Sequence, residues 1–196
     1  TPIEKQLGDI LDNMLVVAVK KRYQSAGEVL RDLQPAVELR SAVGYDYTKL
    51  RDLLANQKWK AADEETAKAM FTVAGRDDFL RVEDIDHFPE DLRTIDRLWL
   101  KFSNGKFGFS VQKEIYQKLG GTMTFDPEKI WRKFGDTVGW RDNRRWLNKW
   151  KDYDELNWRR PLRDNTPGGH LPGLVRDLRN WMELKRYMAL LSRRDL

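Results

Sequence analysis

Apolar residues recur along the chain at the spacing of amphipathic helices, and almost nowhere at the alternation of a strand. The stripe near the N-terminus predicts two short helices within residues 3–34, the second opened by a capping box of Ser25 and Glu28. The next stripes predict a helical hairpin over residues 45–75, and Gly75 suits the left-handed residue that ends its second helix. The N-terminal part of the chain is therefore expected to be helical.

Four further helices are predicted from their start and stop signals. In three of them a proline or an N-cap residue precedes an apolar stripe, and a glycine follows it. The predicted first and last signals are Pro89 and Gly105, Ser110 and Gly120, and Asp126 and Gly135. The fourth helix follows Pro172 and ends in charged residues at Arg193. The predicted fold class is all-α.

The helical pattern lapses between Val138 and Pro172. This segment is too long for an ordinary connection, and long irregular segments in compact domains are usually functional or disordered. Its four tryptophans argue against simple disorder, because disordered segments are poor in aromatic residues. We therefore expect this segment to carry function.

Catalytic and metal-binding chemistry finds little support in the residues. Cysteine is absent, which excludes disulfides, thiolate metal sites and a cysteine nucleophile. His87 and His170 are the only histidines, and neither lies at metal-ligand spacing to the other. The acidic run Asp63–Glu65 is expected to lie at a helix start and complement its dipole. No catalytic residue and no metal ligand is predicted, and a non-enzymatic role is expected.

The sequence contains no long apolar stretch. The longest plain apolar run is Leu15–Val19, far short of the roughly 20 residues that a membrane helix needs. No secretory signal opens the sequence. A soluble intracellular protein is expected.

Positive charge and tryptophan are concentrated in the same part of the chain. From residue 131 onward, 16 Lys and Arg residues stand against 9 Asp and Glu residues, and five of the eight tryptophans lie between Trp131 and Trp158. A large flat apolar ligand with acidic groups would fit such aromatic walls and a basic rim. Single-stranded nucleic acid would fit a similar surface. Composition alone does not separate these two ligands.

Five sequence blocks, in order, resemble the GUN4 family of tetrapyrrole-binding proteins. The blocks are YDYTKLRDLLANQKWKAADEETAKAM at 45–70, EDIDHFPEDLRTIDRLW at 83–99, FSNGKFGFSVQKEIY at 102–116, KFGDTVGW at 133–140 and GGHLP at 168–172. The resemblance implies a compact all-helical domain, likened to a cupped hand, whose palm holds protoporphyrin IX, Mg-protoporphyrin IX or a linear bilin. It also implies a non-catalytic regulator that stimulates magnesium chelatase through its large H subunit. Such a protein is expected in the cytoplasm of a cyanobacterium, or in a plastid of an alga or plant.

The same resemblance maps a ligand site onto this sequence. Its two loops fall at about residues 75–82 and 141–169. The residues implied in ligand binding are Val82, Phe88, Phe107, Phe109, Trp150, Leu156, Trp158, Leu174, Arg176 and Arg179. The two arginines are expected to meet the ligand's propionates. Phe107 and Phe109 are expected at the palm floor or in the core.

The chain departs from the family pattern at two palm positions. Ala67 stands where studied members carry a basic residue, and Val82 stands where they carry an aromatic ring. Trp131 and Trp140 are expected in the core rather than in the ligand site. His170 is expected to shape a turn rather than to coordinate magnesium.

The N-terminal residues resemble a different family. ILDNML followed by KKRYQSAGEVLRDL is similar to the closing helices of bacterial Ser/Thr protein kinases, although no kinase active-site motif is present. We therefore predict a kinase-tail-like or accessory helical segment at residues 1–40 and a GUN4-like domain at residues 41–196.

Two functions are carried forward from the sequence. The first is non-catalytic porphyrin or bilin binding that regulates magnesium chelatase in chlorophyll biosynthesis. The alternative is a tetrapyrrole-sensing or interaction module linked to a Ser/Thr kinase, without chelatase activation. A monomer is expected that binds no nucleic acid and associates with a membrane at most peripherally.

Overall fold

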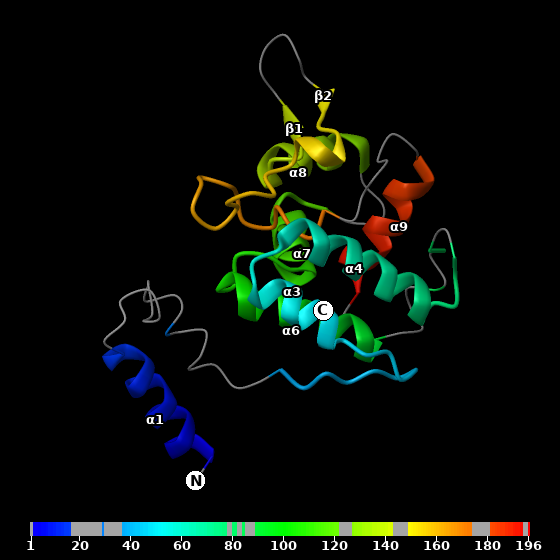
Figure 1. Cartoon of the computed structure of the whole chain (residues 1–196). Helices are drawn as coiled ribbons and strands as arrows, with labels where there is room; N and C mark the ends of the chain where they lie inside the picture. The colour runs from blue at the N-terminus through cyan, green and yellow to red at the C-terminus, as the bar shows by residue number, and fades with distance from the viewer. Residues whose placement is uncertain are drawn as a thin grey trace. The chain divides into compact units, whose positions relative to one another are not determined.

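The computed structural model of the chain divides into two compact units, Thr1–Val37 and Glu38–Leu196. It describes residues 2–16, 29, 37–77, 80–81, 84, 89–121, 127–142, 149–173, 181–193 and 196. The first unit contains helix α1, Pro2–Leu15 (Figure 1). The predicted capping box at Ser25 and Glu28 lies outside the described residues.

The second unit is built from helices. Its described elements are α3 Thr48–Ala55, α4 Trp59–Val73, α6 Pro89–Ser103, α7 Phe109–Lys118, α8 Pro127–Val138, β1 Arg141–Asp142, β2 Lys149–Trp150, the 3-10 turn η2 Tyr153–Glu155 and α9 Trp181–Ser192. The two short strands pair antiparallel. The predicted all-α class is confirmed. In the described part of the chain, no helix is both long enough and apolar enough to cross a membrane.

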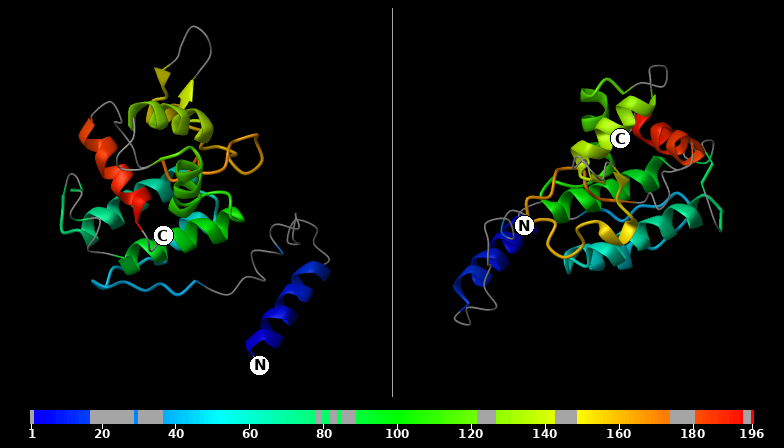
Figure 2. Two further views of the ribbon diagram at one scale, coloured as in Figure 1. Left: turned by 180° about the vertical axis from the view of Figure 1, so that it is seen from behind. Right: turned by 90° about the horizontal axis from the view of Figure 1, so that it is seen from above.

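Three helices, α3, α4 and α6, pack on one another, while α7 contacts both α8 and α9 (Figures 1 and 2). The core of the three-helix group contains Leu50, Leu54, Trp59, Leu92, Ile95, Leu98 and Trp99. The Trp99 indole N–H donates a hydrogen bond of 3.0 Å to the Thr66 hydroxyl, so the ring is buried without an unsatisfied donor. The predicted hairpin over residues 45–75 is confirmed as α3 and α4.

Helix ends use left-handed residues, as predicted for Gly75. Gly75 has φ 64°, and the N–H of Arg76 donates to the carbonyl of Phe71, which satisfies a carbonyl in the last turn of α4. The end of α3 has the same geometry, but there the left-handed residue is Gln57, with φ 55°. A residue with a Cβ is strained in this conformation.

The sequence pattern predicts that Ser110 caps helix α7, and this prediction is wrong. The helix begins at Phe109, after Gly108, and the N–H of Ser110 donates at 2.9 Å to Oδ1 of Asp96 on α6. A Cβ on Gly108 would lie 2.7 Å from that oxygen, so the glycine lets the carboxylate reach the helix start. The prediction fails because the cap comes from another helix. Burial of the Asp96 carboxyl raises its pKa above the ordinary value.

The predicted stop of α8 at Gly135 is also wrong. The helix continues to Val138, and Gly139, with φ 79°, follows its end. Gly135 lies inside the helix because an aromatic ring covers it: a Cβ there would lie 2.5 Å from the Trp150 indole. The glycine therefore marks a close contact rather than a helix end.

An aromatic cluster joins α8, α9 and the β-hairpin. Trp131 stacks on Phe134 with ring centroids 5.0 Å apart, and the Trp140 and Tyr187 rings lie against both. Trp131 is 3% exposed and Trp140 is 4% exposed. The prediction that these two tryptophans belong to the core is confirmed.

Candidate functional site

Residues 149–173 form one continuous irregular segment, which we call the tryptophan segment. It begins in β2, passes through η2 and returns through the GGHLP block to Gly173. No α-helix lies within it, as the lapse in the helical pattern predicts. It contains Trp150, Leu156 and Trp158, three of the residues that the sequence assigns to the ligand site.

Asp63 of α4 fastens two distant points of the tryptophan segment. Its side chain is buried, Oδ2 accepts a hydrogen bond of 2.7 Å from the Tyr153 hydroxyl, and Oδ1 accepts one of 2.6 Å from the N–H of Gly173. Because α4 begins at Trp59, Asp63 lies beyond the first turn, which contains no acidic residue. The predicted helix-dipole role is therefore wrong for Asp63.

Glu65, from the same acidic run, also makes tertiary contacts. Its carboxylate accepts a hydrogen bond from the Tyr45 hydroxyl at 2.8 Å and pairs with the Lys49 ammonium at 2.5 Å. Burial opposes ionisation of Glu65, but these two partners together hold its pKa below the ordinary value. Two of the three acidic side chains therefore position other elements.

The GGHLP block pairs with the turn between α6 and α7. The N–H of Gly108 donates to the carbonyl of Leu171 at 3.0 Å, and the N–H of Gly169 donates to the carbonyl of Lys106 at 2.9 Å. The Leu171–Pro172 peptide bond is cis. Two of the five sequence blocks thus form one structural unit.

Gln112 of α7 completes this attachment from inside the core. Its Nε2 donates to the carbonyls of Gly169 and Pro172, each at 2.8 Å, and its Oε1 accepts from the Tyr187 hydroxyl of α9. Burial raises the pKa of Tyr187 well above its ordinary value, so the hydroxyl remains a donor. One fully buried amide therefore joins α7, α9 and the end of the tryptophan segment.

His170 uses both ring nitrogens within the fold. Nδ1 lies 2.7 Å from the carbonyl of Val138, and Nε2 accepts a hydrogen bond of 3.2 Å from the N–H of Asn157. Burial lowers the pKa of His170 to about 4, and the charges of Lys151 and Lys106 act in the same direction. The neutral ring with its proton on Nδ1 satisfies this arrangement, which agrees with the predicted role in shaping a turn.

Leu156 and Trp158 lie together against Gly173. A Cβ on Gly173 would lie 2.8 Å from the Leu156 side chain and 3.6 Å from the Trp158 ring. The Trp158 ring also packs on Tyr153, at 4.8 Å between centroids, and its indole N–H donates to the Tyr153 carbonyl. Both Leu156 and Trp158 are half-buried, so each retains a surface for contact.

Trp150, at the end of β2, packs against α8. Its ring stacks on Trp131 with centroids 5.8 Å apart and lies directly over Gly135. The Arg141 guanidinium lies 5.5 Å from the Trp150 centroid and pairs with Asp136 at 2.9 Å. Trp150 is half-buried in this stack, so part of its surface is also accessible.

Phe107 and Phe109 lie beneath the GGHLP block rather than on a surface. Each ring is 0% exposed, and Phe107 meets Trp59 edge-on with centroids 5.8 Å apart. The α6–α7 turn therefore carries aromatic rings because it is part of the core. This burial favours the core alternative over direct contact with a ligand.

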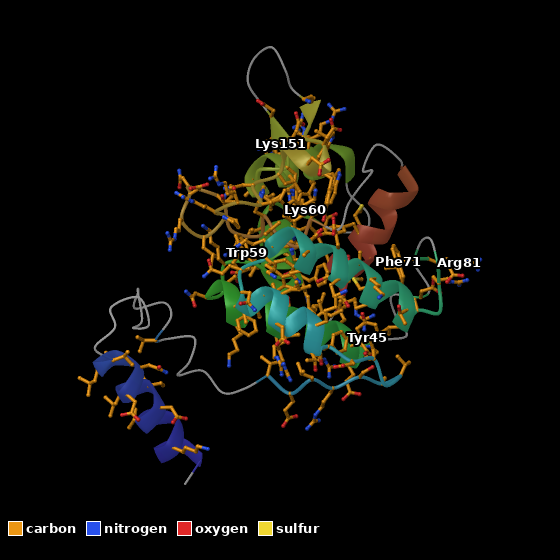
Figure 3. All side chains as sticks on the ribbon, viewed as in Figure 1. Tyr45, Trp59, Lys60, Phe71, Arg81 and Lys151 are labelled. Carbon is orange, nitrogen blue, oxygen red and sulfur yellow. The ribbon has the colours of Figure 1, made fainter. Side chains whose placement is uncertain are left out.

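Helix α4 and the tryptophan segment also meet at an exposed ion pair. Lys60 lies near the start of α4 (Figure 3). Its ammonium lies 2.6 Å from the Asp154 carboxylate and 5.7 Å from the Tyr153 ring centroid. Within the described residues, no group of three or more His, Cys, Asp and Glu side chains is arranged to hold a metal ion.

A family model described as GUN4-like matches residues 40–189 of the chain. The chain belongs to this GUN4-like family. The match begins at residue 40, so the kinase-tail-like or accessory character of residues 1–40 stays a prediction.

Two relatives are similar in sequence to more than two thirds of this chain. A protein of Arabidopsis thaliana named "Tetrapyrrole-binding protein, chloroplastic" is 38% identical over 144 residues, which cover 69% of this chain and 51% of that protein. A Ycf53-like protein of Synechocystis sp. is 35% identical over 146 residues, covering 72% of this chain and 56% of the relative. The chain thus spans about half the length of these relatives.

Solved structures of GUN4 share the fold. The ligand-free structure of Arabidopsis thaliana GUN4 superposes with a TM-score of 0.59 at 32% identity, covering 76% of this chain and 93% of that one. GUN4 from Chlamydomonas reinhardtii gives a TM-score of 0.58 at 31% identity, covering 79% and 94%.

Half of the predicted ligand residues of this GUN4-like chain fall outside the described part. They are Val82, Phe88, Leu174, Arg176 and Arg179. The structure nevertheless brings Leu156 and Trp158 next to Gly173, directly before Leu174 in the sequence. Trp150 packs on Trp131 and Gly135 of α8, and Ala67 is half-buried on α4.

Sequence reasoning missed the residues that hold the GUN4-like site together. Asp63, Gln112 and Asp96 are each polar, nearly or fully buried, and bonded to backbone groups far along the chain. Asp63 and Gln112 lie on helix faces that the tryptophan segment covers. Polar residues on an otherwise apolar helix face are the signal that marks them, although the partner is not visible from that face alone.

Proposed function

We propose that this chain binds a tetrapyrrole without chemical conversion and acts as a regulator of magnesium chelatase in chlorophyll biosynthesis. The observation that carries the proposal is membership of the GUN4-like family, together with 38% identity to a relative named as a tetrapyrrole-binding protein. The ligand is protoporphyrin IX, Mg-protoporphyrin IX or a linear bilin. The partner is the large H subunit of the chelatase, in a cyanobacterial cytoplasm or a plastid.

The tryptophan segment supplies the apolar part of the proposed site. Leu156, Trp158 and Trp150 present half-buried apolar surface, and a tetrapyrrole disc gains roughly 25 cal/mol for each Å² of apolar surface that it buries. Phe107 and Phe109 support this surface from the core. Val82, Phe88 and Leu174 add walls in the same proposal.

Arg176 and Arg179 orient the ligand in this proposal. A guanidinium forms two parallel hydrogen bonds to a carboxylate, so each arginine suits one propionate of a porphyrin. Both follow Gly173, which Asp63 and Leu156 hold in place. The Asp63 attachment thus supports the start of the segment that carries the two arginines.

The experiment is a titration of the full chain with protoporphyrin IX, Mg-protoporphyrin IX and biliverdin, followed by the absorption change of each ligand. We expect saturable binding in the micromolar range or tighter, and Leu156→Ala and Trp158→Ala to weaken it about tenfold. Leu162→Ala is the matched control, because Leu162 is also half-buried in the tryptophan segment but lies in another turn. Absence of saturation with all three ligands contradicts the proposal.

A second candidate function is favoured by the N-terminal unit. Helix α1 exposes Leu7, Leu11, Met14 and Leu15, an apolar surface in a unit separate from the GUN4-like domain. Together with the kinase-tail resemblance, this favours a tetrapyrrole-sensing module linked to a Ser/Thr kinase. Magnesium insertion by a reconstituted chelatase separates the candidates, since only the first predicts a faster reaction when the chain is added.

A further inference from the structure

Three arginines lie on one short turn of the tryptophan segment. Arg159, Arg160 and Arg163 all have exposed side chains, and we call residues 159–163 the arginine turn. In the described structure, their guanidinium groups form no ion pair and no hydrogen bond. Several other arginines of the described residues are paired. Those paired with carboxylates include Arg40, Arg51, Arg76 and Arg141.

The backbone beneath the arginine turn is fixed from several sides. The carbonyl of Arg160 accepts hydrogen bonds from the N–H groups of Arg163 and Asp164, at 3.0 and 2.9 Å. Lys106 donates from its ammonium to the carbonyl of Pro161, which is buried. The three arginines are therefore displayed on a preorganised turn, which lowers the ordering cost of binding.

The carboxylate nearest in sequence is engaged by another group. Asp164 Oδ2 accepts a hydrogen bond of 3.1 Å from the side-chain amide of Asn157, and the same amide donates to the Thr166 hydroxyl at 2.7 Å. The N–H of Asn157 in turn donates to His170. This network directs Asp164 toward Asn157, and the arginine turn retains a net positive charge.

We propose that the arginine turn is a docking site for an acidic segment of a partner protein. Guanidinium groups pair with carboxylates in a planar two-bond geometry, and arginine is enriched among the residues that dominate protein interfaces. The turn is a compact group of three charges, whereas polybasic membrane surfaces usually combine about 4–8 basic residues. This inference stands apart from tetrapyrrole binding, because it uses none of the proposed ligand residues.

Single-stranded nucleic acid fits the turn less well. Binding of that kind relies on aromatic rings that are open for base stacking. Trp158 is the aromatic residue next to the turn, and its ring is packed on Tyr153 while its indole N–H donates to the Tyr153 carbonyl. An acidic protein segment therefore fits the observations better than either a membrane or a nucleic acid.

The test is fluorescence anisotropy of a short labelled peptide of alternating glutamate and glycine, with glutamine replacing glutamate in a control peptide. The full chain should bind the glutamate peptide in preference to the glutamine peptide, and R159A/R160A/R163A should weaken binding about tenfold or more. The lysine variant R159K/R160K/R163K should fall between them, since lysine keeps the charge and loses the planar fork.

The matched control removes three positive charges that lie outside the arginine turn. K58A/K68A/R97A removes the same charge from exposed positions of the second unit, and it should weaken peptide binding less than about threefold. Circular dichroism and urea unfolding of each variant verify that the fold is retained.

Several results would overturn the docking proposal. These are no preference for the glutamate peptide, equal losses in the two triple alanine variants, or tighter arginine-dependent binding to phosphatidylserine vesicles or to single-stranded DNA. Tetrapyrrole titration of the unsubstituted chain is measured separately from peptide binding, so failure of this inference is distinct from failure of the proposed function.

Discussion

Asp63 and Tyr153 lie 90 positions apart in the sequence, and a hydrogen bond of 2.7 Å joins the Tyr153 hydroxyl to the Asp63 carboxylate. The other carboxylate oxygen of Asp63 accepts from the N–H of Gly173. A single buried side chain on α4 thus holds both η2 and the last residue of the tryptophan segment. The position of this segment depends on polar contacts as well as on apolar packing.

Tyr153→Phe should lower the free energy of unfolding by about 1–3 kcal/mol. The substitution keeps the ring that packs on Trp158 and removes only the hydroxyl, so Asp63 loses one hydrogen-bond donor while it stays buried. Urea unfolding followed by tryptophan emission measures the change. The same variant should also weaken tetrapyrrole binding, because the lost hydrogen bond to Asp63 ties Tyr153, and the Trp158 ring packed on it, to α4.

Lys60→Ala is the control for this prediction. Lys60 pairs with Asp154, the residue after Tyr153, but the two side chains are 45% and 81% exposed. Exposed pairs contribute little, so the loss should be less than about 1 kcal/mol. Equal losses in the two variants would mean that the buried carboxylate does not hold the segment.

Acid should weaken the fold through His170. Its ordinary pKa is 6.5 and its pKa in the folded chain is about 4, so the unfolded chain binds more protons between these values. The stability that His170 contributes is therefore fully present well above pH 6.5, and it is lost as the pH falls from 6.5 toward 4. Between pH 7.5 and pH 5 the loss should be about 2 kcal/mol, measured by urea unfolding at each pH.

His170→Asn isolates this titration. Asparagine cannot be protonated in this range, so the variant should be less stable at neutral pH but should lose less stability between pH 7.5 and pH 5. His87→Gln tests the only other histidine of the chain. If His87→Gln rather than His170→Asn removed the pH dependence, the assignment to His170 would be wrong.

The helices were predictable because their signals are local. Pro89 begins α6 and Gly75 ends α4 in the structure, as the sequence pattern predicts, because proline and glycine restrict or relax the backbone where they stand. The two wrong helix boundaries, at Ser110 and Gly135, share one cause. In each case a side chain from another element, Asp96 or Trp150, decides the local structure.

The candidate site was less accessible to sequence reasoning. Apolar residues such as Trp158 could be assigned from family blocks, but the contacts that hold the tryptophan segment are single hydrogen bonds between distant residues. Asp63 with Gly173 and Gln112 with Gly169 are separated by 110 and 57 positions. Helical periodicity relates residues three or four apart, so it carries no information about such partners.

Gln57→Gly should stabilise the chain by up to about 1 kcal/mol. Gln57 is exposed and has φ 55°, a conformation that strains a residue with a Cβ but not glycine. The opposite substitution, Gly75→Ala, should destabilise by about 1 kcal/mol, because Gly75 has φ 64° at the end of α4. Each change should shift the midpoint of thermal unfolding by roughly 2–4 °C per kcal/mol.

A Cβ added at Gly75 would clash with no neighbouring group. No atom lies within 4 Å of a Cβ placed on Gly75, so the loss in Gly75→Ala comes from the backbone alone. A lower melting temperature for Gln57→Gly would show that the left-handed conformation at Gln57 is not the source of strain.

The contact between Gly135 and Trp150 predicts a substitution at Gly135 whose cost depends on Trp150. A Cβ on Gly135 would lie 2.5 Å from the Trp150 ring, so Gly135→Ala should destabilise the chain by about 1–3 kcal/mol. In the Trp150→Ala background the ring is gone and Arg141 Cδ, 3.0 Å from the added Cβ, is the nearest remaining atom, so the loss from Gly135→Ala should shrink to less than about 1 kcal/mol.

Urea unfolding of the two single variants and the double variant measures this coupling. Trp131→Phe is a control, because Trp131 also stacks on Trp150 but is not among the side chains nearest to a Cβ on Gly135. Its combination with Gly135→Ala should therefore be closer to additive than the Trp150 pair. If Gly135→Ala had the same effect with and without Trp150, the indole would not be seated on α8. Trp150 would then be free in solution, and the structural reason for a glycine within α8 would be lost.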